Sequence, residues 1–365
     1  MGRQLALLIS VEKDTETSLI QPGHRLIIVK ADPFNAEAAR PALRAEITEP
    51  HFVRAHFGVP ALRRAHRLQI GGEVKRALRL TLDQLKTFGR RELTVTLECA
   101  GNNRLDMSPL PPGEPWHEGA LSTARWAGVS LAAVLERAGL APDAVQVAFE
   151  GADRGTPDGE GAPHGIAFQR ALPIEKALDP DTLLALEMNG APIPERHGAP
   201  LRLIVPGWYG MASVKWLERI EVLRDPFEGW FQDDRYVYAH GDDQPTEPVA
   251  EMRCKSIVTR PEPGAILRRG SLPIRGWAWS GSAEVAGVEI SIDGSEQWQA
   301  AQLDEPLGRY AWRAWKLTCR IEEPGRHTIR ARALDAAGNR QPEWCRFNRY
   351  GYGNNAVQTL VVEVG

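Results

Sequence analysis

The sequence predicts an α+β domain over residues 1–245, followed by an immunoglobulin-like antiparallel β-sandwich over residues 246–365. In the first part, short runs of strand and helix periodicity alternate, strands outnumber helices, and no βαβ repeat dominates. From about residue 250 onward, runs of alternating polarity are separated by turn residues, as in paired antiparallel strands. A chain of 365 residues is long enough for two domains that each bury a core.

Three elements of the first domain follow from local patterns. Residues 93–97 alternate in polarity with period two, which predicts a half-buried strand. Ser130 can cap a helix over residues 131–138, and Gly139 follows in the position where helices commonly end. Residues 201–205 form another β-rich run, which a proline and a glycine close.

The sandwich prediction depends on two further runs. Residues 288–292 and 329–333 alternate between apolar or small side chains and mostly polar ones, and turn residues follow each run. The same region supplies large groups for a core or an interface: Trp277, Trp279, Trp312 and Trp315.

Two segments lack such patterns. Residues 1 to about 45 carry no motif that assigns an element. Residues 225–248 mix Pro, Gly and Asp with aromatic residues, and this composition is too aromatic for a free tether. We therefore expect the second segment to pack along the junction between the two domains.

The composition excludes several classes of partner. The chain has 44 Lys and Arg against 47 Asp and Glu, a formal net charge of −3, and no run of basic residues. Neither nucleic acid nor an anionic membrane surface is therefore expected to bind it. No apolar stretch approaches the ~20 residues that a membrane span requires. A site for an anion must come from a local cluster of cations.

The termini and the cysteines bear on the cellular compartment. The apolar run at residues 5–9 is short, and neither a cleavage site nor a twin-arginine pair accompanies it. A cytoplasmic location is expected, or a periplasmic one if a signal peptide has been removed. The absence of a Cys-x-x-Cys pair argues against structural zinc, an iron–sulfur cluster or attached haem. Cys254, Cys319 and Cys345 are expected as reduced thiols, with a Cys319–Cys345 disulfide as the alternative in an exported protein.

The fourth cysteine has a different setting. Cys99 stands at the end of the predicted strand, and Gly101 and Arg104 follow it closely. Thiolates bind soft or high-valent metals, and nearby positive charge favours the thiolate. A glycine lets the backbone approach a bulky group. Taken alone, Cys99 also fits a buried thiol that acts only as a small apolar residue.

Basic and polar residues elsewhere are candidate anion contacts. Arg54 and His56 are two residues apart, so in extended backbone they point to the same side and can bind one anion together. The other candidates are spread along the chain: Asp153, His197, Arg202, Ser213 and Lys215. Each of these residues alone also fits a solvated surface or loop, and only their order and spacing are distinctive.

Together these strings resemble the sulfite oxidase family of molybdenum enzymes. The similarity extends from about residue 50 to the C-terminus. It rests on five ordered strings: Arg54–Pro60, Cys99–Arg104, Thr123–Val129, Glu187–Gly190 running on to His197–Gly198, and Val214–Leu217.

The resemblance implies a molybdenum–molybdopterin cofactor, one per chain, and no haem. Cys99 would be the single protein ligand to molybdenum, completed by one pyranopterin dithiolene and oxo groups. By position, eight residues would hold the pterin and its phosphate: Ala55, His56, Asp153, His197, Arg202, Ser213, Val214 and Lys215. The sandwich would be the dimerisation domain of a homodimer.

The resemblance also implies a reaction and a substrate pocket. The expected activity is oxygen-atom transfer, oxidising sulfite to sulfate and passing electrons to a separate cytochrome or small-molecule acceptor. Arg54 and Arg104 would bind the small anionic substrate through paired N–H donors. Tyr236 falls where sulfite oxidases carry an active-site tyrosine, although an aromatic residue there also fits simple packing at the domain junction.

Two departures from the family pattern concern the substrate. Sulfite-oxidising members commonly place an arginine just after a string such as Trp277–Gly281, and none follows here. Asp233 and Asp234 stand where basic residues often precede the tyrosine. Carboxylates within ~10 Å of the pocket would oppose a dianion unless they are screened.

These departures leave alternatives open. With the same cofactor, the protein could instead reduce a sulfoxide, an N-oxide or nitrate. From a different class, it could be a non-enzymatic two-domain binding protein, which would contain no metal and would tolerate Cys99→Ser.

Overall fold

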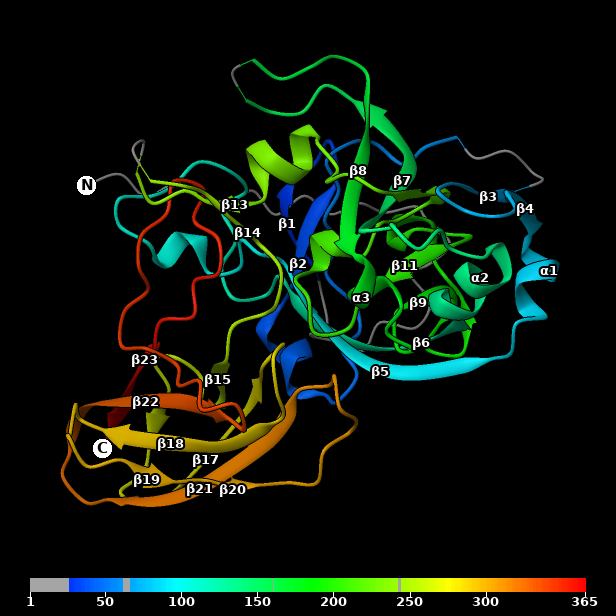
Figure 1. The fold of residues 1–365 in the computed structure, drawn as a ribbon. Coiled ribbons are helices and arrows are strands. Elements are labelled where there is room, and N and C mark those ends of the chain that lie inside the picture. Colours follow the sequence, from blue (N-terminus) through cyan, green and yellow to red (C-terminus); the bar gives the residue numbers. More distant parts are fainter. Residues whose placement is uncertain (1–25, 62–65, 160, 242–243) are drawn as a thin grey trace.

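The computed structural model describes residues 26–61, 66–159, 161–241 and 244–365. Figure 1 shows a larger N-terminal body of sheets and short helices above a smaller body of paired strands. As predicted, strands outnumber helices. Over the described ranges the α-helices are three, and none exceeds eight residues: α1 (Leu82–Lys86), α2 (Leu131–Ala138) and α3 (Ile174–Ala177).

Two five-stranded sheets form the scaffold of the N-terminal body. One has the order β4 (Leu78–Thr81), β3 (Arg67–Gly72), β12 (Leu217–Leu223), β7 (Gln146–Gly155), β8 (Ile166–Pro173). The other has the order β10 (Ala191–Pro192), β9 (Leu183–Met188), β6 (Leu121–Ser130), β5 (Arg91–Glu98), with β11 (Arg202–Ile204) on β9. Only the β3–β12 pair is parallel within these two sheets.

The short elements connect these sheets and carry several site residues. Short 3-10 helices are η2 (Arg40–Arg44), η3 (Arg104–Asp106), η4 (Glu195–His197) and η5 (Gly210–Ala212), and η6 (Trp230–Arg235) is a π-helix. Two small ribbons pair β1 (Leu26–Lys30) with β2 (Asn35–Ala38), and β13 (Val237–Tyr238) with β14 (Glu247–Pro248). None of the described helices is long and apolar enough to cross a membrane.

The structure contains the three elements predicted in the first domain, although the bounds of the two strands differ from those predicted. β5 contains the predicted strand 93–97, β11 contains most of 201–205, and α2 has the predicted bounds. Gly139 ends α2 with φ 73°, a conformation that favours glycine. Ser130 occupies the N-cap position, but its hydroxyl makes no capping hydrogen bond, so that part of the prediction is wrong.

The C-terminal body consists of two sheets that face each other across one core (Figure 1). The first has the order β15 (Lys255–Arg260), β17 (Gly270–Trp279), β21 (Arg313–Ile321), β20 (Gln302–Leu303). The second has the order β16 (Ile266–Leu267), β23 (Thr359–Val364), β22 (Gly325–Asp335), β18 (Val285–Ile292), β19 (Gln299–Ala300). Ile274 and Trp315 from the first sheet pack in the core with Ile290 and Ile329 from the second. The strands predicted at 288–292 and 329–333 lie in β18 and β22.

Tryptophans join the two bodies. Trp277 and Trp312 stack with ring centroids 4.7 Å apart, and both belong to the core cluster of the N-terminal body. The Trp277 indole N–H donates to the Leu43 carbonyl at 2.6 Å, and that of Trp312 donates to the Glu46 carbonyl at 3.0 Å. Phe231, in the aromatic segment 225–248, belongs to the same cluster and packs on His56, Phe57 and Phe168 of the N-terminal body. Its packing therefore does not test the predicted position of the segment along the junction.

Candidate active site

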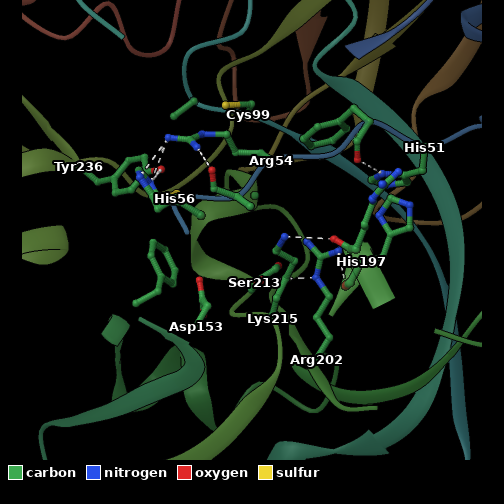
Figure 2. A pocket seen from close by; sticks show the side chains of 17 residues that line it. His51, Arg54, His56, Cys99, Asp153, His197, Arg202, Ser213, Lys215 and Tyr236 are labelled. Carbon is green, nitrogen blue, oxygen red and sulfur yellow. Dashed lines mark hydrogen bonds between the residues drawn. The ribbon is translucent and has the colours of Figure 1, made fainter. Parts of the chain in front are cut away.

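Two cavities meet at Cys99. We call the first the inner cavity and the second the outer cavity. The second is called outer because it includes Asp158, whose side chain is 79% exposed. Four predicted residues line both cavities: Arg54, His56, Cys99 and Tyr236. Figure 2 shows the inner cavity, which also brings together the predicted Ala55, Asp153, His197, Arg202, Ser213 and Lys215.

The end of β5 positions the thiol. The backbone N–H of Cys99 donates to the Ala120 carbonyl at 2.8 Å, which fixes the turn against the chain that enters β6. Arg104, on η3, then folds back and donates to the carbonyls of Glu114 at 2.6 Å and Tyr350 at 3.0 Å. A Cβ at Gly101 would overlap the Arg104 guanidinium, so a glycine is required for this arrangement.

Opposing effects act on the Cys99 thiol. Burial raises its pKa, whereas the charges of Arg54 and Arg104 lower it, and the net shift is upward. The predicted effect of nearby positive charge is therefore present, but burial outweighs it. A metal cation bound to the sulfur would reverse this balance, because a coordinating thiol loses its proton.

A hydrogen-bonded chain connects Arg54 to Tyr236. One Nη of Arg54 lies 3.1 Å from Nδ1 of His56, and Nε2 of the same ring lies 2.8 Å from the Tyr236 hydroxyl. Burial and the charge of Arg54 lower the pKa of His56 well below its usual value, so the ring is neutral. If Nδ1 accepts from Arg54, then Nε2 carries the proton and donates to the Tyr236 oxygen. The Tyr236 hydroxyl proton is then free to point into the cavity.

Buried cations gather at the far end of the inner cavity (Figure 2). Burial lowers the pKa of Arg202 to about 9, and burial together with the Arg202 charge lowers the pKa of Lys215 strongly. Arg202 donates to the His197 carbonyl at 3.0 Å, and Lys215 donates to the Arg196 carbonyl at 3.1 Å. Within the described ranges, neither cation forms a salt bridge. Two cations without a salt bridge among the described residues, gathered at one end of a cavity, are expected at a site for an anion.

An unpaired acceptor completes the inner cavity. Asp153 is 4% exposed, its Oδ1 has no hydrogen-bond partner among the described residues, and burial raises its pKa to about 6. A ligand with N–H groups would satisfy this oxygen. The donor set therefore fits a group that carries a metal near Cys99, an anion near Arg202 and Lys215, and N–H donors near Asp153.

Comparisons with known proteins identify the family. Residues 56–231 match the oxidoreductase molybdopterin binding domain, and residues 246–364 match the Mo-co oxidoreductase dimerisation domain. Sulfite oxidase of Gallus gallus is 40% identical to this chain over 88% of the chain and 73% of its own length. The chain belongs to the sulfite oxidase family. It is a molybdenum-cofactor oxidoreductase that uses a molybdenum–molybdopterin cofactor.

Two other relatives agree with this family. The mitochondrial sulfite oxidase of Mus musculus is 37% identical over 91% of this chain and 64% of its own length, so this chain spans about two thirds of that relative. The solved structure of the sulfane dehydrogenase SoxCD from Paracoccus pantotrophus superposes with a TM-score of 0.78. It is 28% identical, and the match covers 95% of this chain and 87% of that one.

Three residues that the sequence analysis singled out do not line either cavity of this sulfite oxidase family member. Val214 is fully buried in the core and lines neither cavity. Asp233 and Asp234 are exposed on η6 and also line neither cavity, so solvent can screen the charges that were expected to oppose a dianion. Asp233 instead accepts a hydrogen bond from the Gly229 N–H at 2.8 Å, which stabilises the start of η6.

The cavities also contain residues that the sequence did not reveal. The inner cavity includes His51, Phe168, Arg196 and Met211. The outer cavity includes Lys30, Glu114, Arg235, Tyr350 and Tyr352. Arg196 and Arg235 had a local signal, because they directly precede the predicted His197 and Tyr236. The tyrosines come from a loop that follows β22 and reaches the site from the C-terminal part of the chain.

Proposed function

We propose that this protein oxidises sulfite to sulfate by oxygen-atom transfer and passes the electrons to a separate acceptor. The observation that carries the proposal is the position of two guanidinium groups, those of Arg54 and Arg104, beside the Cys99 thiol where the two cavities meet. The charges of both groups act on that thiol. The names of the two sulfite oxidase relatives support sulfite as the substrate.

The inner cavity would hold the cofactor. Cys99 would supply the ligand to molybdenum, Asp153 would accept N–H groups of the pterin, and Arg202 with Lys215 would neutralise its phosphate. When bound, the molybdenum cofactor supplies the redox centre at which an oxygen atom is transferred. The remaining assigned residues that line this cavity, Ala55, His197 and Ser213, would shape the cradle around the cofactor.

The chain's own residues would bind and orient the substrate. Arg54 and Arg104 each offer planar, paired donors that match an oxyanion. Neutral His56 would orient the Tyr236 hydroxyl, which could then donate a hydrogen bond to the substrate. Burial raises the pKa of this phenol, so Tyr236 acts as a hydrogen-bond donor and not as a base. Phe168 and Phe231 pack on the His56 ring and exclude water from one side.

Domain organisation and assembly follow the same proposal. Residues 1–245 would form the catalytic domain and residues 246–365 an immunoglobulin-like dimerisation domain of a homodimer. The facing sheets and the match to the dimerisation domain support this assignment. We also propose a cytoplasmic location, which is supported by the free thiols of Cys99, Cys254, Cys319 and Cys345.

The test uses protein produced in a host that makes molybdopterin. Elemental analysis should find about one molybdenum per chain, and sulfite should reduce ferricyanide in a protein-dependent reaction. If the protein contains molybdenum and reduces nitrate, an N-oxide or a sulfoxide but does not oxidise sulfite, the proposal that sulfite is the substrate is wrong. Absence of molybdenum in soluble, folded protein would overturn the whole proposal.

A further inference from the structure

The π-helix η6 presents two consecutive residues to the outer cavity. It spans Trp230–Arg235, and Tyr236 ends it with φ −90° and ψ 61°. The wide turn of a π-helix is common at functional sites. Here it leaves Asp233 and Asp234 exposed to solvent, whereas Arg235 and Tyr236 line the outer cavity.

The Arg235 guanidinium has a defined position in that cavity. It lies 5.2 Å from the ring centroid of Tyr350, within the range of a cation–π contact. On another side it meets Gly159, where a Cβ would lie 3.3 Å from Nη1 of Arg235. Gly159 has φ +134° and also lines the outer cavity. The guanidinium therefore lies between the Tyr350 ring and the backbone of Gly159.

The other cations of the outer cavity already have protein partners. Lys30 forms salt bridges with Asp158 at 3.0 Å and with Glu114 at 3.9 Å. Arg104 donates to two carbonyl oxygens, and Arg54 is bonded to His56. For Arg235, the carboxylates of the described ranges offer no partner within 4.0 Å. Its charge nevertheless reaches the site, because it lowers the pKa of His56 and opposes the rise in that of Tyr352.

Among the described residues, the string Trp277–Gly281 and the residues directly after it supply no cation to either cavity. Trp279, in the string Trp277–Gly281, donates to Glu98 at 2.9 Å, and Ser280 and Ser282 both donate to Asp335. None of the residues that follow this string, up to Glu284, lines either cavity. A substrate with two negative charges would therefore find its additional cation on η6.

We propose that Arg235 is a specificity-determining residue that selects doubly charged oxyanions in the outer cavity. The inference rests on the proposed function and names the charge class of the substrate. A guanidinium binds two oxygens of one anion through paired N–H groups. Added to Arg54 and Arg104, a third cation beside the substrate favours a dianion over a monoanion of similar size.

Two variants of the holoenzyme test this role. In Arg235→Gln, the KM for sulfite should rise about tenfold or more while kcat stays within about twofold, because binding is lost and the reacting centre is untouched. Arg235→Lys should recover part of the loss. Arg349→Gln is the matched control: Arg349 contacts the same Tyr350 ring at 5.7 Å but lines neither cavity. Its KM should stay within about twofold of the unmodified protein.

A binding measurement separates this inference from the proposed activity. Sulfate, a dianion, should bind the holoenzyme in calorimetric titration and should bind Arg235→Gln about tenfold more weakly, whereas binding of nitrate, a monoanion, should change less than about threefold. If the unmodified protein lacks sulfite turnover but shows this sulfate pattern, the role of Arg235 holds and the proposed function fails. Equal losses of sulfate binding in Arg235→Gln and Arg349→Gln would overturn the inference. The binding would then depend on positive charge anywhere near the cavity and not on Arg235 in particular. Unchanged sulfate binding, or loss of molybdenum from Arg235→Gln, would also overturn it.

Discussion

A buried ion pair links the C-terminal body to the strand end that carries Cys99. Lys255, on β15, donates to Glu98 at 2.9 Å and to the Asn103 side-chain oxygen at 2.8 Å. Both charged side chains are 2% exposed. The second carboxylate oxygen of Glu98 accepts from the Trp279 indole at 2.9 Å. The pair therefore belongs to a buried hydrogen-bond network in which each charge is compensated by the other.

Replacing Lys255 by methionine should destabilise the protein strongly. The variant keeps the apolar stem of the side chain but leaves the Glu98 carboxylate buried without its cation. Removing one partner of a buried pair costs about 3–5 kcal/mol. The donors that remain, Asn102 at 3.0 Å and Trp279, are present before and after the change, so they do not offset the loss. The double variant Lys255→Met with Glu98→Gln removes both charges and should recover at least about 2 kcal/mol of the sum of the single losses.

The assay is guanidinium unfolding followed by circular dichroism and by tryptophan fluorescence. Coincidence of the two transitions checks the two-state assumption for this two-domain chain. Lys86→Met is the control, because Lys86 pairs with Asp83 at 3.0 Å while its side chain is 63% exposed. That variant should lose less than about 1 kcal/mol. A cost below about 1 kcal/mol for Lys255→Met, or strict additivity in the double variant, would refute the reasoning.

Three further predictions concern the site. Cys99→Ser should abolish turnover and molybdenum retention while the circular dichroism spectrum stays unchanged, and an active Cys99→Ser enzyme would disprove the ligand assignment. Lys215→Ala should lower the molybdenum content of purified protein, yet the cofactor-free form should be as stable as before or more stable, because burial lowers the pKa of that ammonium and disfavours its charge. Glu37→Gln should flatten the pH dependence of stability: burial raises the pKa of Glu37 from 4.5 to about 7, so the native state holds a proton that the unfolded chain releases. The contribution of Glu37 to the free energy of unfolding should therefore fall as pH rises from 4.5 to 7, by up to roughly 3 kcal/mol, and a variant with the same slope as the unmodified protein would contradict this.

Elements that depend on neighbours in the chain could be predicted from the sequence. The helix at residues 131–138 and the strand at 93–97 follow from periodicity and end signals, since both are properties of short segments. The ordered strings also predicted the family and most of the inner cavity, because a cofactor site places particular residue types at fixed positions along the chain. Arg54, Cys99 and Lys215, far apart in sequence, do line one cavity.

Only the tertiary structure decided how the outer cavity is built. Tyr350 and Tyr352 reach Cys99 from a loop beyond β22, and Lys255 meets Glu98 across 157 residues, contacts that no local pattern encodes. The structure also decided which charges face the substrate. Asp234 and Arg235 are adjacent in sequence, yet the wide turn of η6 directs one to solvent and the other to the cavity. A sequence fixes which charges are present, but the direction of each depends on backbone geometry that packing against the rest of the molecule determines.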